Sequence, residues 1–292
     1  MLTHRYRDDQ TPRRVVVLGA GGFLGRSLVR SLTNADVEVL ALGSREIDLS
    51  EPSAAACLSE RLRQDDALVF LSALTPDKGR DSGVLMRNLA MARSVSAAAS
   101  KLKLAHLVYA SSDAVYPFST SLIGEGTAAA PAELYGAMHR TREILLTQEA
   151  AVPLAVLRFT AIYGPGDTHN SYGPNRFVRQ ALDTGRIDLF GHGEEARDHL
   201  FIADAVASLR AVLARGSTGL INVASGTSVT FRQIADRIAA AQPGVVVAAS
   251  ERKNPITHRH FDVSEMLAAF PKLRTTAMAA GIASTIEALA AR

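Results

Sequence analysis

The stretch Arg14–Gly25, an apolar run that ends in closely spaced glycines, constrains the fold of this chain more than any other. Its β-branched residues predict a buried strand that turns sharply into a helix. Gly19 would permit the turn, Gly22 would let the backbone approach a pyrophosphate, and Gly25 would let helix and strand pack closely. A glycine-rich turn without a ligand is the alternative. The candidate cofactor-binding residues here are Gly19, Gly22, Phe23, Leu24 and Gly25.

Segments with strand-like and helix-like patterns alternate after this turn. A helix is expected over 23–35, a strand over 37–42, a strand over 67–73, a helix over about 84–100 and a strand over 105–110. Such alternation predicts an α/β fold of Rossmann type, with a doubly wound parallel sheet and right-handed crossovers.

The second half of the chain changes character after residue 165, where it becomes rich in loops and polar residues. We expect a dinucleotide-binding domain over 13–165 that also receives about 199–224. The remainder, 166–198 and 225–292, is expected to form a smaller C-terminal substrate-binding portion.

Composition narrows the possible partners. The chain has 292 residues, a formal charge of +3 and scattered basic residues with few aromatics, which argues against nucleic acid binding. No apolar run is long enough for a membrane span, and Met1–Pro12 reads as a frayed lead-in without a secretory signal. The single cysteine, Cys57, excludes an internal disulfide and fits a cytoplasmic location, and no metal site is expected.

The end of the second strand bears on the choice of cofactor. Dinucleotide sites usually place an acid there for the ribose 2′-hydroxyl, but Ser44 and Arg45 occupy this window. Arg45 suits a 2′-phosphate, so we expect NADP, with NAD as the alternative. Asp48, followed by Leu49, could reach the adenine or cap a helix that Pro52 opens. Ala73, after the third strand, is a further candidate cofactor-binding residue.

Two hydroxyl groups follow the strand that ends near residue 110. Ser112 comes directly after this strand, and Tyr135 lies at the head of the next helix. Together they could hold a carbonyl or hydroxyl oxygen while the tyrosine exchanges a proton and a nicotinamide exchanges a hydride. Serine and tyrosine are also common as capping and core residues.

At this point the chain resembles the extended short-chain dehydrogenase/reductases, the NAD(P)-dependent nucleotide-sugar epimerase/dehydratase family. The resemblance covers nearly the whole chain and rests on motifs in the family's order: Gly19-x-x-Gly22-Phe23-x-Gly25, Ser111-Ser112-x-x-Val115-Tyr116, Tyr135, Arg158-x-x-x-Ile162-Tyr163-Gly164-Pro165-Gly166, Gly193-x-x-x-Arg197-Asp198-His199 and Asn222-Val223-Ala224-Ser225-Gly226.

The resemblance also implies roles for single residues. Ser112 matches the catalytic serine or threonine, and Tyr135 the catalytic acid/base. Arg197 matches an arginine that grips the diphosphate of the substrate, and Asn88 an asparagine near the active site. Further candidate substrate-binding residues are Tyr116, Asn175, Arg176 and Arg259. A homodimer is expected from the resemblance alone.

One position departs from the family pattern, because His139 stands where the family has a lysine four residues after Tyr135. A lysine lowers the pKa of the tyrosine and holds the nicotinamide ribose. We expect an imidazolium at His139 to take over this charge, with activity that falls above about pH 7. The alternative is a weakened or merely binding site, in which His139 only packs.

The residue after Asp113 bears on the reaction. Nucleotide-sugar 4,6-dehydratases carry Thr-Asp-Glu, whereas this chain has Ser112-Asp113-Ala114, so 4,6-dehydration is disfavoured. Asp113 is a candidate catalytic residue or a turn cap. The resemblance implies hydride transfer at a sugar carbon of a nucleotide sugar. An NADPH-dependent 4-keto sugar-nucleotide reductase and a non-catalytic NADP(H)-binding protein are the alternatives.

Each of the two candidate phosphate-binding arginines also has a purely structural interpretation. Arg197 could form an ion pair with Asp198 or Glu194 instead of binding a diphosphate. Arg259 lies in a stretch rich in basic residues that could equally be a solvated surface.

Overall fold

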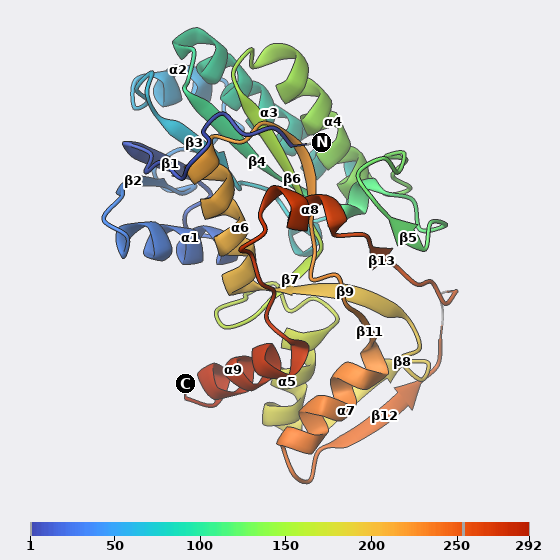
Figure 1. Cartoon of the computed structure of the whole chain (residues 1–292). Coiled ribbons are helices and arrows are strands. Elements are labelled where there is room, and N and C mark those ends of the chain that lie inside the picture. Colours follow the sequence, from blue (N-terminus) through green and yellow to red (C-terminus); the bar gives the residue numbers. More distant parts are fainter. Residues whose placement is uncertain (1, 253–254, 292) are drawn as a thin grey trace.

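Six parallel strands form the central sheet of the protein, of which the computed structural model describes residues 2–252 and 255–291 (Figure 1). The strand order is β10-β6-β4-β3-β1-β2, and every neighbouring pair is parallel. The bounds are β1 Arg14–Leu18, β2 Glu38–Leu42, β3 Ala67–Phe70, β4 His106–Ser112, β6 Leu154–Phe159 and β10 Gly219–Val223. This topology confirms the predicted Rossmann-type, doubly wound parallel sheet.

Helices cover both faces of this sheet. Because side chains alternate along a strand, Val15 and Val17 of β1 face one core while Val16 and Leu18 face the other. The first core is closed by α1 (Phe23–Thr33) and α6 (Ile202–Arg215). The second is closed by α2 (Ala54–Ser59), α3 (Ser82–Leu102) and α4 (Leu134–Glu149).

A third apolar core lies among α5 (Pro174–Thr184), α7 (Phe231–Ala241) and α9 (Met278–Ala290), in the lower part of Figure 1. Helix α7 begins at the predicted cap, since the Thr230 hydroxyl accepts from the Gln233 amide. The two domain boundaries given above stay predictions. The remaining elements are β5 Leu122–Ile123, β7 Ala161–Tyr163, β8 Arg186–Phe190, β9 Ala196–Phe201, β11 Ser228–Thr230, β12 Val246–Ser250, β13 His260–Phe261, α8 Ser264–Ala269, η1 Pro76–Lys78 and η2 Asp113–Val115.

Two local expectations are wrong. The N-terminal segment is not frayed over its described part, because Thr3 forms a bridge with Thr218 and the Gln10 amide donates to the Ala214 carbonyl. Met1 lies outside the described residues. Pro52 does not open α2, which begins at Ala54 after Ser53. Within the described ranges, no helix is long and apolar enough to cross a membrane.

The strand order places a topological switch point between β1 and β3, because the chain leaves β1 toward β2 on one side and returns to β3 on the other. Ligands of open α/β sheets bind at such points, at the carboxyl ends of the strands. The glycine turn follows β1 there. Gly19 adopts a φ of +85°, and a Cβ on it would lie 2.8 Å from the Ser72 nitrogen after β3.

The contact between the glycine turn and α1 is testable. A Cβ at Gly25 would lie 2.2 Å from the Gly19 carbonyl oxygen, whereas one at Gly21 would meet no heavy atom within 4 Å. We expect Gly25→Ala to lower the free energy of unfolding by about 1–3 kcal/mol, since backbone must move to accommodate the methyl group. Gly21→Ala, the matched control, should change it by less than about 0.5 kcal/mol in urea denaturation. Equal effects would contradict the close approach.

Candidate active site

The glycine turn fits a dinucleotide pyrophosphate. Cβ atoms at Gly19, Gly22 and Gly25 would lie 2.8, 3.2 and 2.2 Å from backbone atoms, so a larger residue would fill the turn. Helix α1 follows with no side chain capping its first amides. Free amides and the helix dipole both favour an anion at this end. Phe23 is buried and Leu24 half-buried in α1, so both support the helix through packing.

An acid lies at the end of β2, contrary to the expectation that none does. The Glu46 carboxylate accepts from the Gly43 amide at 2.8 Å. A Cβ at Gly43 would be 3.0 Å from that carboxylate and 3.8 Å from the Gly21 nitrogen. Ser44 and Arg45 are exposed beside it. Both a carboxylate and a guanidinium are therefore available where a ribose 2′-position is usually recognised.

Asp48 does not cap a helix. Its carboxylate accepts from the Ser50 amide at 2.9 Å and from the Ser50 hydroxyl at 2.6 Å. These bonds lower the pKa of Asp48 and close a short turn. Leu49 is buried in the core against the second sheet face. Ala73 is half-buried just beyond β3, at the switch point.

The two hydroxyl groups meet at the carboxyl end of β4. Ser112 ends this strand, and its hydroxyl accepts from the Ala114 amide at 3.1 Å. Tyr135 is the second residue of α4, and Gly136 beside it packs so closely that a Cβ would lie 2.1 Å from the Ala114 carbonyl oxygen. Burial, together with the Asp113 charge, raises the pKa of Tyr135 to about 12, against the nearby Arg142 charge and Ser112 hydroxyl. Tyr135 is therefore protonated near neutral pH.

His139 does not carry the expected charge. It is 3% exposed, and its Nδ1 lies 2.7 Å from the Tyr109 hydroxyl. Burial, with the Arg142 charge, lowers the pKa of His139 to about 3, so the imidazole is neutral at any pH of interest. The prediction of an imidazolium at His139 is wrong, so this residue gives no reason to expect activity to fall above pH 7. The ring packs edge-on against Tyr135, with centroids 4.7 Å apart.

The charge near Tyr135 comes from a residue that the sequence reasoning missed. Arg142 is fully buried and donates to the Asn88 side-chain oxygen at 2.8 Å and to the Ser72 carbonyl at 2.8 Å. Asn88 also joins α3 to the loop after β3, since its Oδ1 accepts from the Leu74 amide. The available signal for Arg142 was its spacing, since it follows Tyr135 by seven residues and so lies on the same face of the helix.

Two predicted substrate-binding residues are wholly engaged in the fold. The Tyr116 hydroxyl is buried, donates to Asn222 at 2.7 Å and accepts from Arg158 at 2.9 Å. The Asn175 side chain accepts from the Gly164 amide at 2.9 Å and donates to its carbonyl at 2.7 Å. The side-chain polar atoms of both residues thus have hydrogen-bond partners within the fold, and their roles in substrate binding stay predictions. Arg176 is half-buried over the Tyr172 ring.

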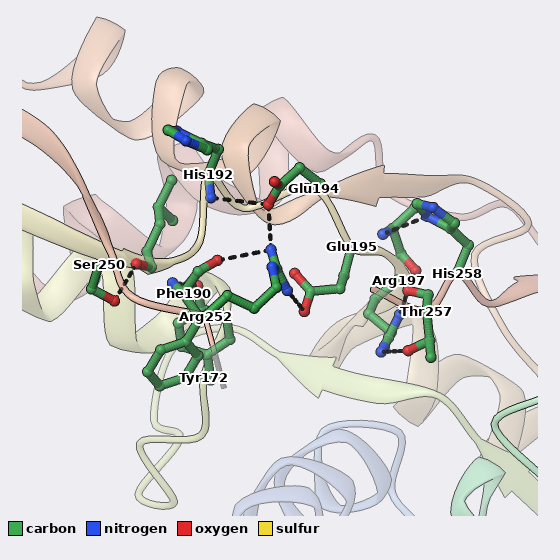
Figure 2. A network of polar contacts seen from close by, with 12 residues as sticks. Tyr172, Phe190, His192, Glu194, Glu195, Arg197, Ser250, Arg252, Thr257 and His258 are labelled. Carbon is green, nitrogen blue, oxygen red and sulfur yellow. Dashed lines mark hydrogen bonds and ion pairs between the residues drawn. The ribbon is translucent and has the colours of Figure 1, made fainter. Parts of the chain in front are cut away.

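Arg197 forms neither of its suggested ion pairs. Its guanidinium donates to the Thr257 hydroxyl at 2.7 Å and to the Ala196 carbonyl at 2.9 Å (Figure 2). Asp198 instead accepts from Thr160 and Ser225. Burial and the neighbouring Arg259 charge lower the pKa of Arg197, so the two guanidinium groups repel each other.

Arg259 is not part of a solvated surface, since it is 4% exposed. It pairs with the Asp113 carboxylate at 3.2 Å and donates to the Asp113 carbonyl at 2.7 Å. This ion pair, rather than a turn cap, holds the Asp113 side chain. Burial nevertheless raises the pKa of Asp113 against the Arg259 charge.

A network of polar contacts holds the loop before Arg197 (Figure 2). Arg252 forms ion pairs with Glu194 and Glu195, which ties β12 to this loop. Beside it, the Tyr172 hydroxyl accepts from the Phe190 amide at 2.8 Å, and the two rings stack with centroids 4.5 Å apart. His192, which could have suggested a metal, only donates its amide to Glu194.

A glycine turn at the switch point, with a serine–tyrosine pair at the same edge of the sheet, is typical of dinucleotide-binding α/β proteins of Rossmann type. The family model of the NAD dependent epimerase/dehydratase family matches residues 15–224, so the chain belongs to this family and the resemblance is confirmed. It is 32% identical over 111 residues to an uncharacterized UDP-glucose epimerase, YtcB, of Bacillus subtilis, covering 37% of this chain and 35% of that protein.

A second curated relative is also named as an epimerase. A dTDP-L-rhamnose 4-epimerase of Burkholderia thailandensis is 32% identical over 148 residues, 47% of this chain and 41% of that protein. The matches thus span less than half the length of these curated relatives.

Solved structures match over the whole fold. The NAD-dependent NDP-hexosamine 5,6-dehydratase TunA superposes with a TM-score of 0.84 at 22% identity, covering 96% of this chain and 98% of that chain. A UDP-glucose 4-epimerase of Thermus thermophilus in complex with NAD gives 0.83 at 19% identity, covering 95% and 99%. At these identities the likeness shows a shared fold.

The ion pair beneath the site can be tested for its contribution to stability. The buried Glu143 carboxylate accepts from Arg158 at 2.6 and 2.8 Å and from Ser111 at 2.7 Å. Glu143→Ala leaves Arg158 buried without its partner, and we expect it to lower the free energy of unfolding by about 3–5 kcal/mol. Glu149→Ala, at an exposed position of the same helix, should change it by less than about 0.5 kcal/mol. Urea denaturation checks both, and similar losses would contradict the role of the pair.

Proposed function

We propose that this protein catalyses hydride transfer at a sugar carbon of a nucleotide sugar, with Tyr135 as the acid/base. The observation that carries this proposal is the position of Tyr135 beside Ser112 at the carboxyl edge of the sheet, the same edge at which the glycine turn follows β1. A proton-transfer group and a dinucleotide cradle at one edge suit a redox step at a carbinol or ketone.

The two hydroxyl groups divide the work at the substrate oxygen. When bound, the nicotinamide supplies the hydride chemistry. In oxidation, the ionised form of Tyr135, which is the minor form near neutral pH, takes the proton from the sugar hydroxyl, while Ser112 donates a hydrogen bond to the same oxygen. In reduction Tyr135 returns that proton to the carbonyl oxygen, in the state that its raised pKa favours near neutral pH.

Arg197 and Arg259 are the proposed diphosphate contacts. The two guanidinium groups repel each other, and among the described residues only Arg259 has an ion-pair partner, Asp113, which leaves an excess of positive charge. A diphosphate would satisfy this excess through paired, charge-assisted hydrogen bonds. The Arg259 Nε is buried and without a hydrogen-bond partner among the described residues, which leaves a donor for such an anion.

Epimerase or ketoreductase chemistry fits the residues after Ser112 better than 4,6-dehydration. Ala114 has no carboxyl group, so only Asp113 of the acid pair is present. The 4-keto sugar-nucleotide reductase and the non-catalytic dinucleotide-binding protein are then outcomes of the activity test.

The activity test uses UDP- and dTDP-sugars, and their 4-keto forms, with NAD(H) or NADP(H). We expect turnover or hydride transfer with at least one of them, because the proposed acid/base Tyr135 lies near the Ser112 hydroxyl at the sheet edge where ligands of this fold bind. Tyr135→Phe should lower the rate by about a hundred- to ten-thousand-fold. Tyr6→Phe, near the N-terminus, is the control and should behave as wild type. Cofactor binding without any hydride transfer would support the non-catalytic alternative.

The cofactor we propose is NAD rather than the NADP expected from the sequence. That expectation depended on the absence of an acid after β2, and the Glu46 carboxylate lies there on the Gly43 amide. A carboxylate can accept from a ribose 2′-hydroxyl but repels a 2′-phosphate. Arg45, exposed beside it, is the group that would favour NADP instead.

Calorimetric titration with NADH and NADPH decides between them. We expect NADH to bind more tightly by about 1–2 kcal/mol, the size of a charge-assisted hydrogen bond. Glu46→Gln should reduce or reverse this preference, whereas Glu51→Gln, also exposed, should leave it unchanged. If NADPH binds more tightly and Arg45→Ala abolishes that preference, the cofactor is NADP.

A further inference from the structure

Arg142 differs from every other buried arginine of the described chain. Arg14 pairs with Asp66 at 2.7 Å, Arg158 with Glu143 at 2.6 Å and Arg259 with Asp113 at 3.2 Å. Arg142 is 0% exposed, yet none of the described carboxylates lies within ion-pair distance. A buried charge is costly unless it is paired.

All hydrogen-bond partners of Arg142 among the described residues are neutral. Its guanidinium donates to the Asn88 carbonyl at 2.7 and 2.9 Å, to the Asn88 side-chain oxygen at 2.8 Å and to the Ser72 carbonyl at 2.8 Å. The Phe70 ring lies 4.9 Å below it. These contacts fix the guanidinium in place but leave its full positive charge uncompensated.

The uncompensated charge lies beneath the proposed acid/base. Arg142 is two helical turns from Tyr135 on the same side of α4. Between them, Tyr109 contacts His139 at 2.7 Å, and His139 packs against the Tyr135 ring at 4.7 Å. The Arg142 charge lowers the pKa of both Tyr135 and Tyr109 against the effect of burial.

Only one ring nitrogen of His139 has a hydrogen-bond partner among the described residues. Its Nε2 is buried and has no hydrogen-bond partner among the described residues, and its Nδ1 is engaged with Tyr109. The neutral imidazole therefore lies between the Tyr109 hydroxyl and the Tyr135 ring.

We propose that Arg142 is a positioning residue whose unpaired buried charge stabilises the ionised form of Tyr135 through the neutral Tyr109–His139 pair. This inference rests on the proposed function, in which Tyr135 must lose and regain a proton. Other groups also act on Tyr135: Asp113 and Asp77 oppose its ionisation, and the Ser112 hydroxyl favours it. Arg142 is the cation among them.

The first test follows the ionisation of Tyr135 without substrate. Phenolate absorbance is recorded against pH for the wild type and Arg142→Met, each with a Tyr135→Phe partner to subtract the other tyrosines. We expect ionisation of Tyr135 to move to higher pH in Arg142→Met. Arg93→Met, at an exposed position of α3, is the control and should cause no shift. An unchanged titration in Arg142→Met would overturn the inference, whether or not the activity test finds a substrate.

The second test is rescue of the hydride-transfer rate by a cation at another position. Arg142→Met should slow hydride transfer by about ten- to a thousand-fold. Adding His139→Lys restores a cation on the same helix face, one turn from Tyr135, and should recover at least about tenfold. Recovery is specific to charge, because a purely structural role of Arg142 would not respond to lysine at this position. No recovery, with both variants folded, would contradict the proposal.

A third variant covers the case in which Arg142→Met does not fold. Asn88→Asp nearly preserves shape and places a carboxylate on the guanidinium, whose contact with the Asn88 oxygen is 2.8 Å. Neutralising Arg142 in this way should also move the Tyr135 titration to higher pH. In the wild type the rate of reduction should stay flat between about pH 6 and 9, since neither His139 nor Tyr135 titrates there.

Discussion

The buried Glu143 carboxylate is the contact on which the arrangement of the candidate site depends. From α4 it accepts from Ser111 at the end of β4 and from Arg158 on β6, so it fixes the helix on two central strands at once. Tyr135 lies two turns earlier on the same helix, and Ser112 directly follows Ser111. An ion pair in the core thereby sets the distance between two hydroxyl groups at its edge.

Close backbone contacts at two glycines also fix helices on the sheet edge where the cofactor would bind. The Gly25 and Gly136 positions leave no room for a methyl group, because each faces a carbonyl oxygen of the preceding turn or strand connection. The first draws α1 onto the glycine turn, and the second draws α4 onto Ala114. Both helices can therefore begin at the sheet edge where ligands of this fold bind.

Two residues of α4 act on Tyr135 in different ways, one by packing against its ring and the other through its positive charge. His139 occupies the position nearest Tyr135 but is neutral, because burial and a neighbouring cation both oppose its protonation. Arg142, one turn further in, keeps its charge because carbonyl oxygens surround it. Packing against Tyr135 and charge near Tyr135 thus come from different residues.

Sequence alone determined the fold and the outline of the site. The run Arg14–Gly25 predicts a strand and a turn because a strand buried on both faces is almost continuously apolar and a tight turn needs glycine. Ser112 and Tyr135 were identified by their places after a strand and at a helix start. The tertiary structure decided the charges. Whether His139 titrates, whether Arg259 is solvated and whether Tyr116 has a free hydroxyl depend on neighbours far away in the chain, such as Tyr109, Asp113 and Asn222. Burial and pairing of this kind are set by packing, which local sequence does not record.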